Sequence, residues 1–576
     1  MIFLLFSFLL SASAAFQPCP LPGAAFLPPK HLATDQNFKQ LAVNLTKKLD
    51  RALNSGQSSY GPVQKDNTAY SVSVFAVDNP DLLSQWHHTP DMIKNSSFGV
   101  QTVDANSVYR IASVSKLVTV YALLASIGDQ YWHRPVTDFV PELQQHVEED
   151  TKSALEYVQW DQVTLSDLAS EISGVTRDFI ARKNDISFIP ASVAQMVGLP
   201  ALSPDDLPPC LLNATGTVQD CDRTEFFASI DTRQPIFPSG LKAAYSNTAF
   251  LILGYAMESI TGRSFGDILD QSIIEPLSLN RTFYSKPEDS MGVIPSTPWE
   301  SLWNLVTALP ASGGMYSSSS DLAVIGRSIL SSELLTPATT RSWLKPDAFT
   351  TSVNTAVGKS WEIYRFPLYE HRNVDAYTKS GSLGAYTSNI ILLPEFGVGY
   401  SVLTAGRALE APVTRTIAES LIPGLEEIAR LQSVENLVGT FRAMDGGLNS
   451  SMIFTSDAGL PGLGVSSFIS DGKDVVANLG SQFLGSGQGL SLRLYPAELE
   501  QDVGDGTRRI GFRIAYEVVE EAQNSPFAAC ATWFGVDGLS YGRHGVDQVV
   551  FTVDENGRAL SVEPLLLDVV LTKVGS

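Results

Sequence analysis

Ser113, Val114, Ser115 and Lys116 form a Ser-x-x-Lys motif. Residues three apart in a helix lie on one face, so the Lys116 amine should lie near the Ser113 hydroxyl. A serine hydroxyl is a weak nucleophile until a base takes its proton, and a desolvated lysine with a lowered pKa can be that base. Because a helix start offers free N–H groups that stabilise an oxyanion, the motif predicts acyl transfer through Ser113.

A second motif, Tyr245-Ser246-Asn247, precedes a strongly apolar segment. Alternate residues of an extended segment point the same way, so Tyr245 and Asn247 could face one site together. A phenol near an ammonium is pushed toward its anion, which makes Tyr245 a candidate base or proton shuttle. Asn247 supplies an amide that could orient Lys116 or a substrate carbonyl.

A third motif, Lys379-Ser380-Gly381, is followed by Ser382 and a strand-like segment. Such an edge strand would place an ammonium and a hydroxyl beside the site, and Gly381 leaves room for a ligand backbone. The N–H of Ser382 is a candidate oxyanion donor. Taken alone, each of the three motifs also fits a purely structural role, as a solvated helix face, a packed tyrosine or a turn; their order and context favour the catalytic interpretation.

The elements that must position these residues follow from hydrophobic periodicity. Residues 113–127 predict a helix that stops at Gly128, and residues 248–260 predict a buried helix. Further helices are expected over 37–54, 163–173 and 414–431, and a strand over 70–77. The apolar runs within 386–405, separated by Pro394 to Gly397, predict two adjacent antiparallel strands.

Beyond residue 430 the pattern changes to short alternating runs separated by Gly and Asp-Gly turns. The runs cover 464–469, 490–495, 510–518, 549–553 and 565–571. This pattern is typical of a small all-β sandwich or barrel. A domain boundary is therefore expected between 425 and 435, which gives domains of 16–430 and 431–576.

Composition excludes several classes of protein. The chain has 576 residues, of which 44% are hydrophobic and 17% charged, so it can bury a large core and is not disordered. A net charge of −22 disfavours binding to nucleic acid. Seven His and four Cys without clustering, and no H-E-x-x-H or phosphate-binding loop, predict no metal and no cofactor.

The N-terminus predicts a compartment. Residues 2–10 are apolar and Ala12-Ser13-Ala14 follows, the layout of a cleaved signal over 1–15, although no Lys or Arg precedes the run and a buried element is the alternative. No other run is long and apolar enough for a membrane anchor, so a secreted protein is expected. Five N-x-[ST] acceptors agree with secretion: Asn44, Asn95, Asn213, Asn280 and Asn449. Cys210 and Cys221 flank a short loop and predict a disulfide, whereas spacing does not decide whether Cys19 meets Cys530.

These motifs and their surroundings resemble the serine β-lactamase and penicillin-binding-protein superfamily, most closely the class C β-lactamases and fungal secreted β-lactamase-like proteins. The resemblance covers about 35–425 and includes VYRIASVSK (108–116), PSG ahead of Tyr245 and PASGGMYSSSSDL (310–322). VTLSDLASEISGV (163–175) resembles a family helix that usually ends in a His-Thr-Ser-Gly-type run, and here Glu171 begins that run instead.

The resemblance implies an α/β (α+β) fold, with helices on both sides of an antiparallel sheet, and a lipocalin-like C-terminal all-β domain. It implies that Ser113 is acylated, that Lys116 is its base partner and that Tyr245 is a second base or acid. Lys379 would hold a substrate carboxylate or tune Tyr245. The N–H groups of Ser113 and Ser382 would form the oxyanion hole.

The sequence therefore predicts a secreted serine hydrolase or acyltransferase that works through a Ser113 acyl-enzyme. Its substrate would be a small-molecule ester, lactone or amide, either in scavenging hydrolysis or in a tailoring step on a natural product. The alternative is a catalytically inert β-lactamase-like binding or scaffold protein, with ligand uptake by residues 430–576. The sequence leaves the oligomeric state open.

Overall fold

The computed structural model describes residues 16–147, 153–178, 190–202, 222–231, 233–295, 303–304, 310–369, 371–444, 448–483, 489–519 and 530–575. The chain forms two compact units. The larger unit comprises residues 31–366 and 375–421. The second, which we call the barrel unit, comprises residues 1–30, 367–374 and 422–576.

An eight-stranded sheet forms the centre of the larger unit, in the order β4-β3-β12-β11-β10-β9-β8-β7. Its strands are β3 Thr68–Ala76, β4 Asn79–His88, β7 Ala348–Phe349, β8 Thr355–Val357, β9 Glu362–Tyr369, β10 Arg372–Leu383, β11 Tyr386–Leu393 and β12 Val398–Gly406. Separate two-stranded pairs are β1 Gln57–Ser58 with β2 Gly61–Pro62, and β5 Val108–Arg110 with β6 Tyr316–Ser318.

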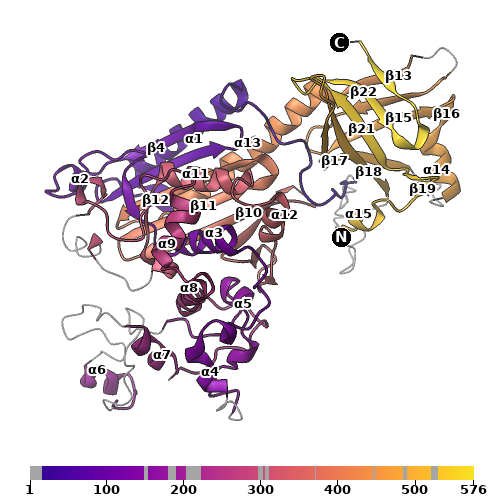
Figure 1. Cartoon of the computed structure of the whole chain (residues 1–576). Helices are drawn as coiled ribbons and strands as arrows, with labels where there is room; N and C mark the ends of the chain where they lie inside the picture. The colour runs from indigo at the N-terminus through magenta and orange to yellow at the C-terminus, as the bar shows by residue number, and fades with distance from the viewer. Residues whose placement is uncertain are drawn as a thin grey trace, which may run out of the picture. The chain divides into compact units, whose positions relative to one another are not determined.

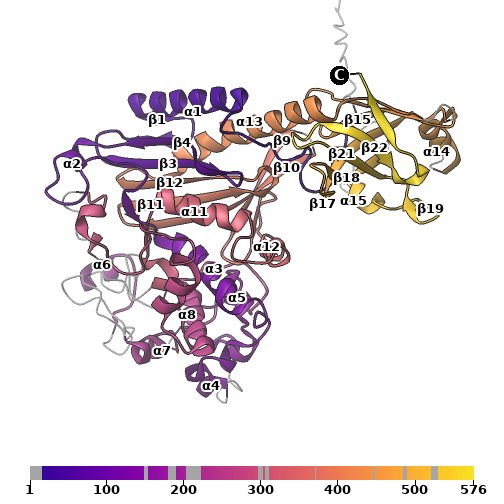
Figure 2. The same cartoon turned by 45° about the horizontal axis from the view of Figure 1, so that its top comes forward.

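Helices cover both faces of this sheet (Figure 2). Helix α1 and the first turns of α13 lie over one face, where Lys48 of α1 pairs with Glu419 of α13. Helix α11 lies over the other face against β3, β11 and β12. Since both faces are covered, the central strands β3 and β12 are buried along their whole length. This confirms the predicted α/β (α+β) class.

The helical elements of the larger unit include one that continues into the barrel unit, α13. In chain order they are α1 Gln36–Ser55, α2 Asp91–Lys94, η1 Ala112–Val114, α3 Ser115–Ile127, η2 Val136–Asp138, α4 Pro141–Val147, η3 Trp160–Gln162, α5 Leu165–Ala169, α6 Ala191–Met196, α7 Arg223–Asp231, α8 Asn247–Thr261, α9 Phe265–Leu269, η6 Asp270–Ile274, η7 Asp289–Met291, η8 Pro310–Gly314, α11 Ser319–Leu330, α12 Pro337–Trp343, η9 Pro394–Phe396 and α13 Ala411–Leu437. Helices α3, α5 and α8 lie together on the side of the sheet that α11 covers (Figure 1).

The barrel unit is a closed antiparallel barrel. Eight strands follow one another around it in chain order, β13-β14-β15-β17-β18-β21-β22-β23, and β23 pairs with β13 to close the ring. The strands of this unit are β13 Gly439–Ala443, β14 Ser451–Thr455, β15 Leu463–Ser470, β16 Lys473–Asp474, β17 Leu490–Asp502, β18 Arg508–Val518, β19 Ser540–Tyr541, β20 His544–Gly545, β21 Gln548–Val553, β22 Ala559–Pro564 and β23 Leu571–Val574. Short helices are α14 Val475–Phe483, α15 Thr532–Gly535 and η10 Leu565–Leu567.

Aromatic rings fill the centre of the barrel. Phe551 lies against Phe441, Phe454 and Phe512, with ring centroids between 5.1 and 5.7 Å apart. An eight-stranded barrel is just wide enough for side chains to fill it, so these rings form its core. The all-β C-terminal domain is thus confirmed, and it is a barrel and not a sandwich.

Two elements differ from the sequence-based expectation. The run 565–571 is not one strand, because η10 turns at Leu565–Leu567 and Asp568 has a left-handed φ of 50° before β23 begins. The helix expected over 163–173 ends at Ala169, because Glu171 has a φ of 60° that a right-handed helix cannot accept.

A disulfide closes the barrel unit on itself. Cys19 is bonded to Cys530, with the two Cα atoms 5.4 Å apart. The predicted partners Cys210 and Cys221 lie outside the described residues, as does Asn213. The other four glycosylation acceptors, Asn44, Asn95, Asn280 and Asn449, are exposed. Among the described residues, no helix has the length and apolar character needed to cross a bilayer.

Candidate active site

Ser113 lies in the short turn η1, between strand β5 and helix α3. Ala112 before it has a φ of 45°, which is uncommon for a residue with a side chain. The hydroxyl of Ser115 holds this turn in place, since it donates to the Ala112 carbonyl (2.6 Å) and accepts from the Met315 N–H (3.1 Å). Backbone that is strained and held in this way is common at catalytic residues.

The Ser113 hydroxyl has two polar neighbours. Its oxygen lies 2.5 Å from the phenolic oxygen of Tyr245 and 3.5 Å from the amine of Lys116. Tyr245 comes directly before helix α8, whose start is capped by the Ser246 hydroxyl. The structure thus brings together the first two motifs, which lie 132 residues apart in the chain.

Lys116 is completely buried on helix α3. Its amine donates to the Asn247 side-chain oxygen (2.6 Å) and to the Ser312 carbonyl (2.8 Å). Burial lowers the pKa of Lys116, although the nearby Tyr245 and Glu171 act to raise it. A lowered pKa increases the fraction of neutral amine, which is the form that can accept a proton from Ser113.

The amide of Asn247 is oriented by a residue outside the three motifs. Its nitrogen donates to the Asp178 carboxylate at 2.7 Å. Its oxygen is therefore turned toward Lys116 and toward the Tyr245 hydroxyl, which donates to it at 3.3 Å. One amide thus contacts both groups that could move the Ser113 proton.

Lys379 and Ser380 lie on β10 and bind a carboxylate from the neighbouring strand β9. The Lys379 amine donates to Glu362 Oε1 (2.5 Å), and the hydroxyl and N–H of Ser380 donate to Glu362 Oε2 (2.7 and 3.0 Å). Burial acts to lower the pKa of Lys379, but the nearby Glu362, Tyr245 and Glu171 together outweigh this effect and the pKa is raised. The Lys379 amine also lies 5.4 Å from the centre of the Tyr245 ring.

Gly381 brings strand β10 against the Ser113 backbone. A side-chain carbon at 381 would lie 2.9 Å from the Ser113 nitrogen and 2.5 Å from the Ser388 hydroxyl, and would also clash with the Ile111 carbonyl. Only glycine therefore leaves the face of the Ser113 N–H uncovered. Ser382, the next residue, is exposed and pairs with Thr387 on β11.

Three acidic residues of the site lie outside the three motifs and were not predicted as site residues. Asp178 orients Asn247, Glu362 binds Lys379, and Glu171 is buried with one oxygen on the Ser246 N–H. In the sequence Glu171 is visible only as a departure from the family pattern. Asp178 and Glu362 could have been suspected only from the rule that buried polar and charged groups have partners. That rule does not identify which acidic residue is the partner.

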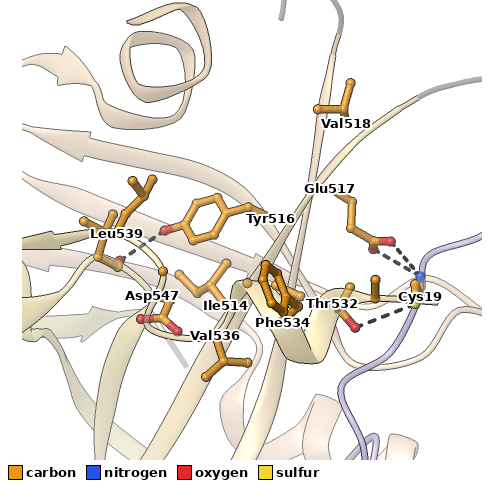
Figure 3. A pocket seen from close by; sticks show the side chains of 15 residues that line it. Cys19, Ile514, Tyr516, Glu517, Val518, Thr532, Phe534, Val536, Leu539 and Asp547 are labelled. Carbon is orange, nitrogen blue, oxygen red and sulfur yellow. Dashed lines mark hydrogen bonds between the residues drawn. The ribbon is translucent and has the colours of Figure 1, made fainter. Parts of the chain in front are cut away.

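A separate cavity of about 630 Å³ lies in the barrel unit (Figure 3). It is lined by Cys19, by residues 514–518 at the end of β18 and by nine residues between 531 and 547. Figure 3 shows the side chains of Tyr516 and Glu517 pointing in opposite directions. The Cys19 N–H donates a hydrogen bond that both carboxylate oxygens of Glu517 share, at 2.9 and 3.1 Å. The Tyr516 hydroxyl donates to the Val546 carbonyl at 3.1 Å. The lining has the size of a small-molecule site but contains no paired nucleophile and base.

Comparison with known proteins matches two family models. The beta-lactamase model matches residues 86–421, which is more than half of the chain. The model described as "Beta-lactamase-like-like, C-terminal domain" matches residues 429–575.

Three of the similar proteins come from fungi. A "Beta-lactamase-like protein" of Arthroderma benhamiae is 30% identical, over 100% of this chain and 99% of that protein. A "Probable hydrolase" of Cochliobolus lunatus is 26% identical, over 88% of this chain and 85% of its own. A "Probable hydrolase" of a Phoma species is 25% identical, over 84% of this chain and 77% of its own.

Proposed function

Because the chain belongs to the beta-lactamase family of serine hydrolases, we propose that it acts through an acyl-enzyme on Ser113. The observation that carries this proposal is the convergence on the Ser113 hydroxyl of the Tyr245 phenol at 2.5 Å and the Lys116 amine at 3.5 Å. The substrate would be an ester, lactone or amide of a small molecule.

In the first step the Ser113 oxygen attacks the substrate carbonyl and its proton passes to Lys116, directly or through Tyr245. The negative charge on the carbonyl oxygen is then stabilised by the Ser113 N–H and, as we propose, by the N–H of Ser382. When the carbonyl reforms, the bond to the leaving group breaks and the leaving oxygen or nitrogen takes up the proton. Positioned proton transfer of this kind contributes about 10²- to 10⁴-fold to rate.

In the second step water attacks the acyl-enzyme, and the same bases take its proton and return one to Ser113. An alcohol or amine in place of water would make the protein an acyltransferase, which is the chemistry of a natural-product tailoring step. Both outcomes pass through one intermediate and therefore need one set of residues. Asn247 and Asp178 hold the bases in place, and Lys379 acts on Tyr245.

Labelling with a fluorophosphonate tests the proposal. The wild type should gain the mass of one phosphonyl group, and the Ser113→Ala variant should gain none. Ser382→Ala serves as a control, because it removes a neighbouring hydroxyl but keeps its backbone N–H, and it should label like the wild type. Absence of a label on the wild type, or a label that survives Ser113→Ala, would refute the acyl-enzyme.

The inert binding alternative draws support from one observation, the cavity of about 630 Å³ in the barrel unit (Figure 3). On that alternative the protein would bind a small molecule at residues 514–518 and 531–547 without turning over any ester. An unlabelled Ser113 together with saturable binding of an apolar fluorescent probe would favour it.

We also propose that residues 1–15 are a signal peptide and that the protein is secreted and glycosylated. The Cys19–Cys530 disulfide supports this, because disulfides persist mainly in oxidising compartments. The exposure of Asn44, Asn95, Asn280 and Asn449 meets a requirement of glycan attachment. The mass of the secreted protein, measured before and after glycosidase treatment, tests both the removal of residues 1–15 and the attachment of glycans.

A further inference from the structure

Three cations surround the Tyr245 ring. The charged groups of Lys116, Arg177 and Lys379 lie 4.7, 4.8 and 5.4 Å from its centre. Three carboxylates lie near these cations. Asp178 is 3.5 Å from Arg177, Glu362 pairs with Lys379, and Glu171 lies near Lys116. When all six groups are ionised, the formal charges of this set cancel.

The donors best suited to hold a carboxylate are already bound to one. An ammonium, a hydroxyl and a backbone N–H converge at Lys379 and Ser380, a set that recognises an anion well. All three donate to the Glu362 carboxylate, at 2.5, 2.7 and 3.0 Å. The protein itself thus supplies the anion that this set would otherwise take from a substrate.

A substrate carboxylate would have two unfavourable ways to bind. It could displace Glu362, whose side chain is 28% exposed, and leave that anion partly buried without its partners. Removing the partner of a buried charge is strongly unfavourable. It could instead bind next to Glu362, where like charges repel each other in a medium that screens poorly.

The other two cations, Lys116 and Arg177, do not make the binding of a substrate carboxylate more favourable. Lys116 is completely buried and its amine is directed at Asn247 and the Ser312 carbonyl. Arg177 is more than half exposed, and Asp178 beside it offsets its charge. An excess of negative charge over the whole chain, −22, adds to the repulsion of an anion.

We propose, on the basis of the acyl-enzyme function above, that the site takes uncharged acyl donors and discriminates against acyl groups that carry a carboxylate. Glu362 is the residue that sets this specificity. Of the two roles open to Lys379, the hydrogen bonds to Glu362 favour the tuning of Tyr245 over the binding of a substrate carboxylate. The substrate class is therefore a neutral ester, lactone or amide.

A pair of para-nitrophenyl esters of adipic acid tests this inference. One ester carries a free carboxylate at the far end and the other a primary amide, so the two differ in charge and hardly in shape. The wild type should show at least tenfold higher kcat/KM for the amide. Equal values, or a preference for the carboxylate, would overturn the inference.

Variants of Glu362 locate the cause. Glu362→Gln should lower the ratio at least tenfold, chiefly by lowering KM for the anionic ester, because it frees the Lys379 ammonium. Glu362→Asp keeps the charge and should retain the wild-type preference. Asp375→Asn is a matched control, since it removes the carboxylate of another β9–β10 ion pair, Arg365–Asp375, away from Lys379. An unchanged ratio in Glu362→Gln, with the unfolding temperature of the wild type, would refute the role of Glu362.

Failure of the inference and failure of the proposed function give different results. If neither ester is turned over but Ser113 is labelled by the fluorophosphonate, the charge selectivity is measured by the concentration of each ester that protects Ser113 from the label. The ratio of these two concentrations then replaces the ratio of kcat/KM values. If Ser113 is not labelled at all, the acyl-enzyme itself is refuted. If both esters acylate Ser113 equally well, the acyl-enzyme stands and the charge selectivity is wrong.

Discussion

The carboxylate of Glu171 accepts a hydrogen bond from the backbone N–H of Ser246, with an N···O distance of 2.6 Å. Ser246 lies between Tyr245 and Asn247, so this bond ties Glu171 to the segment that presents both. The other oxygen, Oε1, has no hydrogen-bond partner among the described residues. Burial raises the pKa of Glu171 to about 7, although two nearby lysines act to lower it. The site thus contains a carboxyl group that changes charge near neutral pH.

Replacing Glu171 by Gln should remove a pH-dependent part of the stability. Because the folded pKa of about 7 lies above the ordinary value of 4.5, the folded state binds more protons than the unfolded state between these values. The contribution is complete below about pH 4.5 and is lost as the pH rises through about 7. At about 1.4 kcal/mol per pKa unit, the loss is on the order of 3 kcal/mol.

Equilibrium unfolding of the wild type and Glu171→Gln at about pH 5 and about pH 8 measures this loss. The variant should gain stability relative to the wild type as the pH rises, because only the wild type must bury an ionised carboxylate. Two stability curves that run parallel over this range would show that Glu171 does not titrate there.

Tyr245→Phe should lower kcat/KM by about 10²- to 10⁴-fold, the usual contribution of a positioned proton-transfer group. The ring that contacts Lys116, Arg177 and Lys379 is kept, so the fold should not change. Steady-state kinetics with a neutral para-nitrophenyl ester measures the effect, with circular dichroism as the control for folding. A loss of less than about tenfold would leave Lys116 as the sole base.

Gly381→Ala should abolish labelling of Ser113 while the protein still folds. The added methyl group would meet the Ser113 nitrogen at 2.9 Å, and β10 would have to move away from the nucleophile. The matched control is Gly489→Ala in the barrel unit, where nothing lies within 4 Å of the new carbon. Labelling of Gly381→Ala at the wild-type rate would mean that β10 does not border the oxyanion site.

Cys530→Ser should destabilise the barrel unit by about 2–5 kcal/mol, the usual effect of losing a native disulfide. A reducing agent should lower the unfolding temperature of the wild type to that of the variant and leave the variant unchanged. If the reducing agent has no effect on the wild type, the two cysteines are not bonded in solution.

The three motifs were predictable because each depends on local geometry. Ser113 and Lys116 are one helical turn apart, and Tyr245 and Asn247 lie on either side of the extended residue Ser246 at the start of helix α8, so each pair faces the same way wherever the chain goes. That the pairs meet follows from the fold, which the sequence supplied only through resemblance to a family. The fold class was likewise predictable through the resemblance to this family.

The acidic partners could not be predicted, because they come from distant parts of the chain. Glu362 reaches Lys379 from a neighbouring strand, and Asp178 reaches Asn247 across 69 residues. Nothing local to Glu171 shows that its φ of 60° ends helix α5, or that its carbonyl accepts a hydrogen bond from Ala244 at 2.7 Å. Tertiary contacts, not helix propensity, decide the conformation there.

The Cys19–Cys530 bond has a consequence for the order of events during synthesis. Residues 16–30 belong to the barrel unit, yet they leave the ribosome long before strands β13 to β23 have been translated. The native bond therefore cannot form until nearly the whole polypeptide exists. A recombinant fragment that starts after residue 430 would lack one of the two cysteines of this cross-link, and circular permutation that fuses residues 16–30 back to the fragment would restore it.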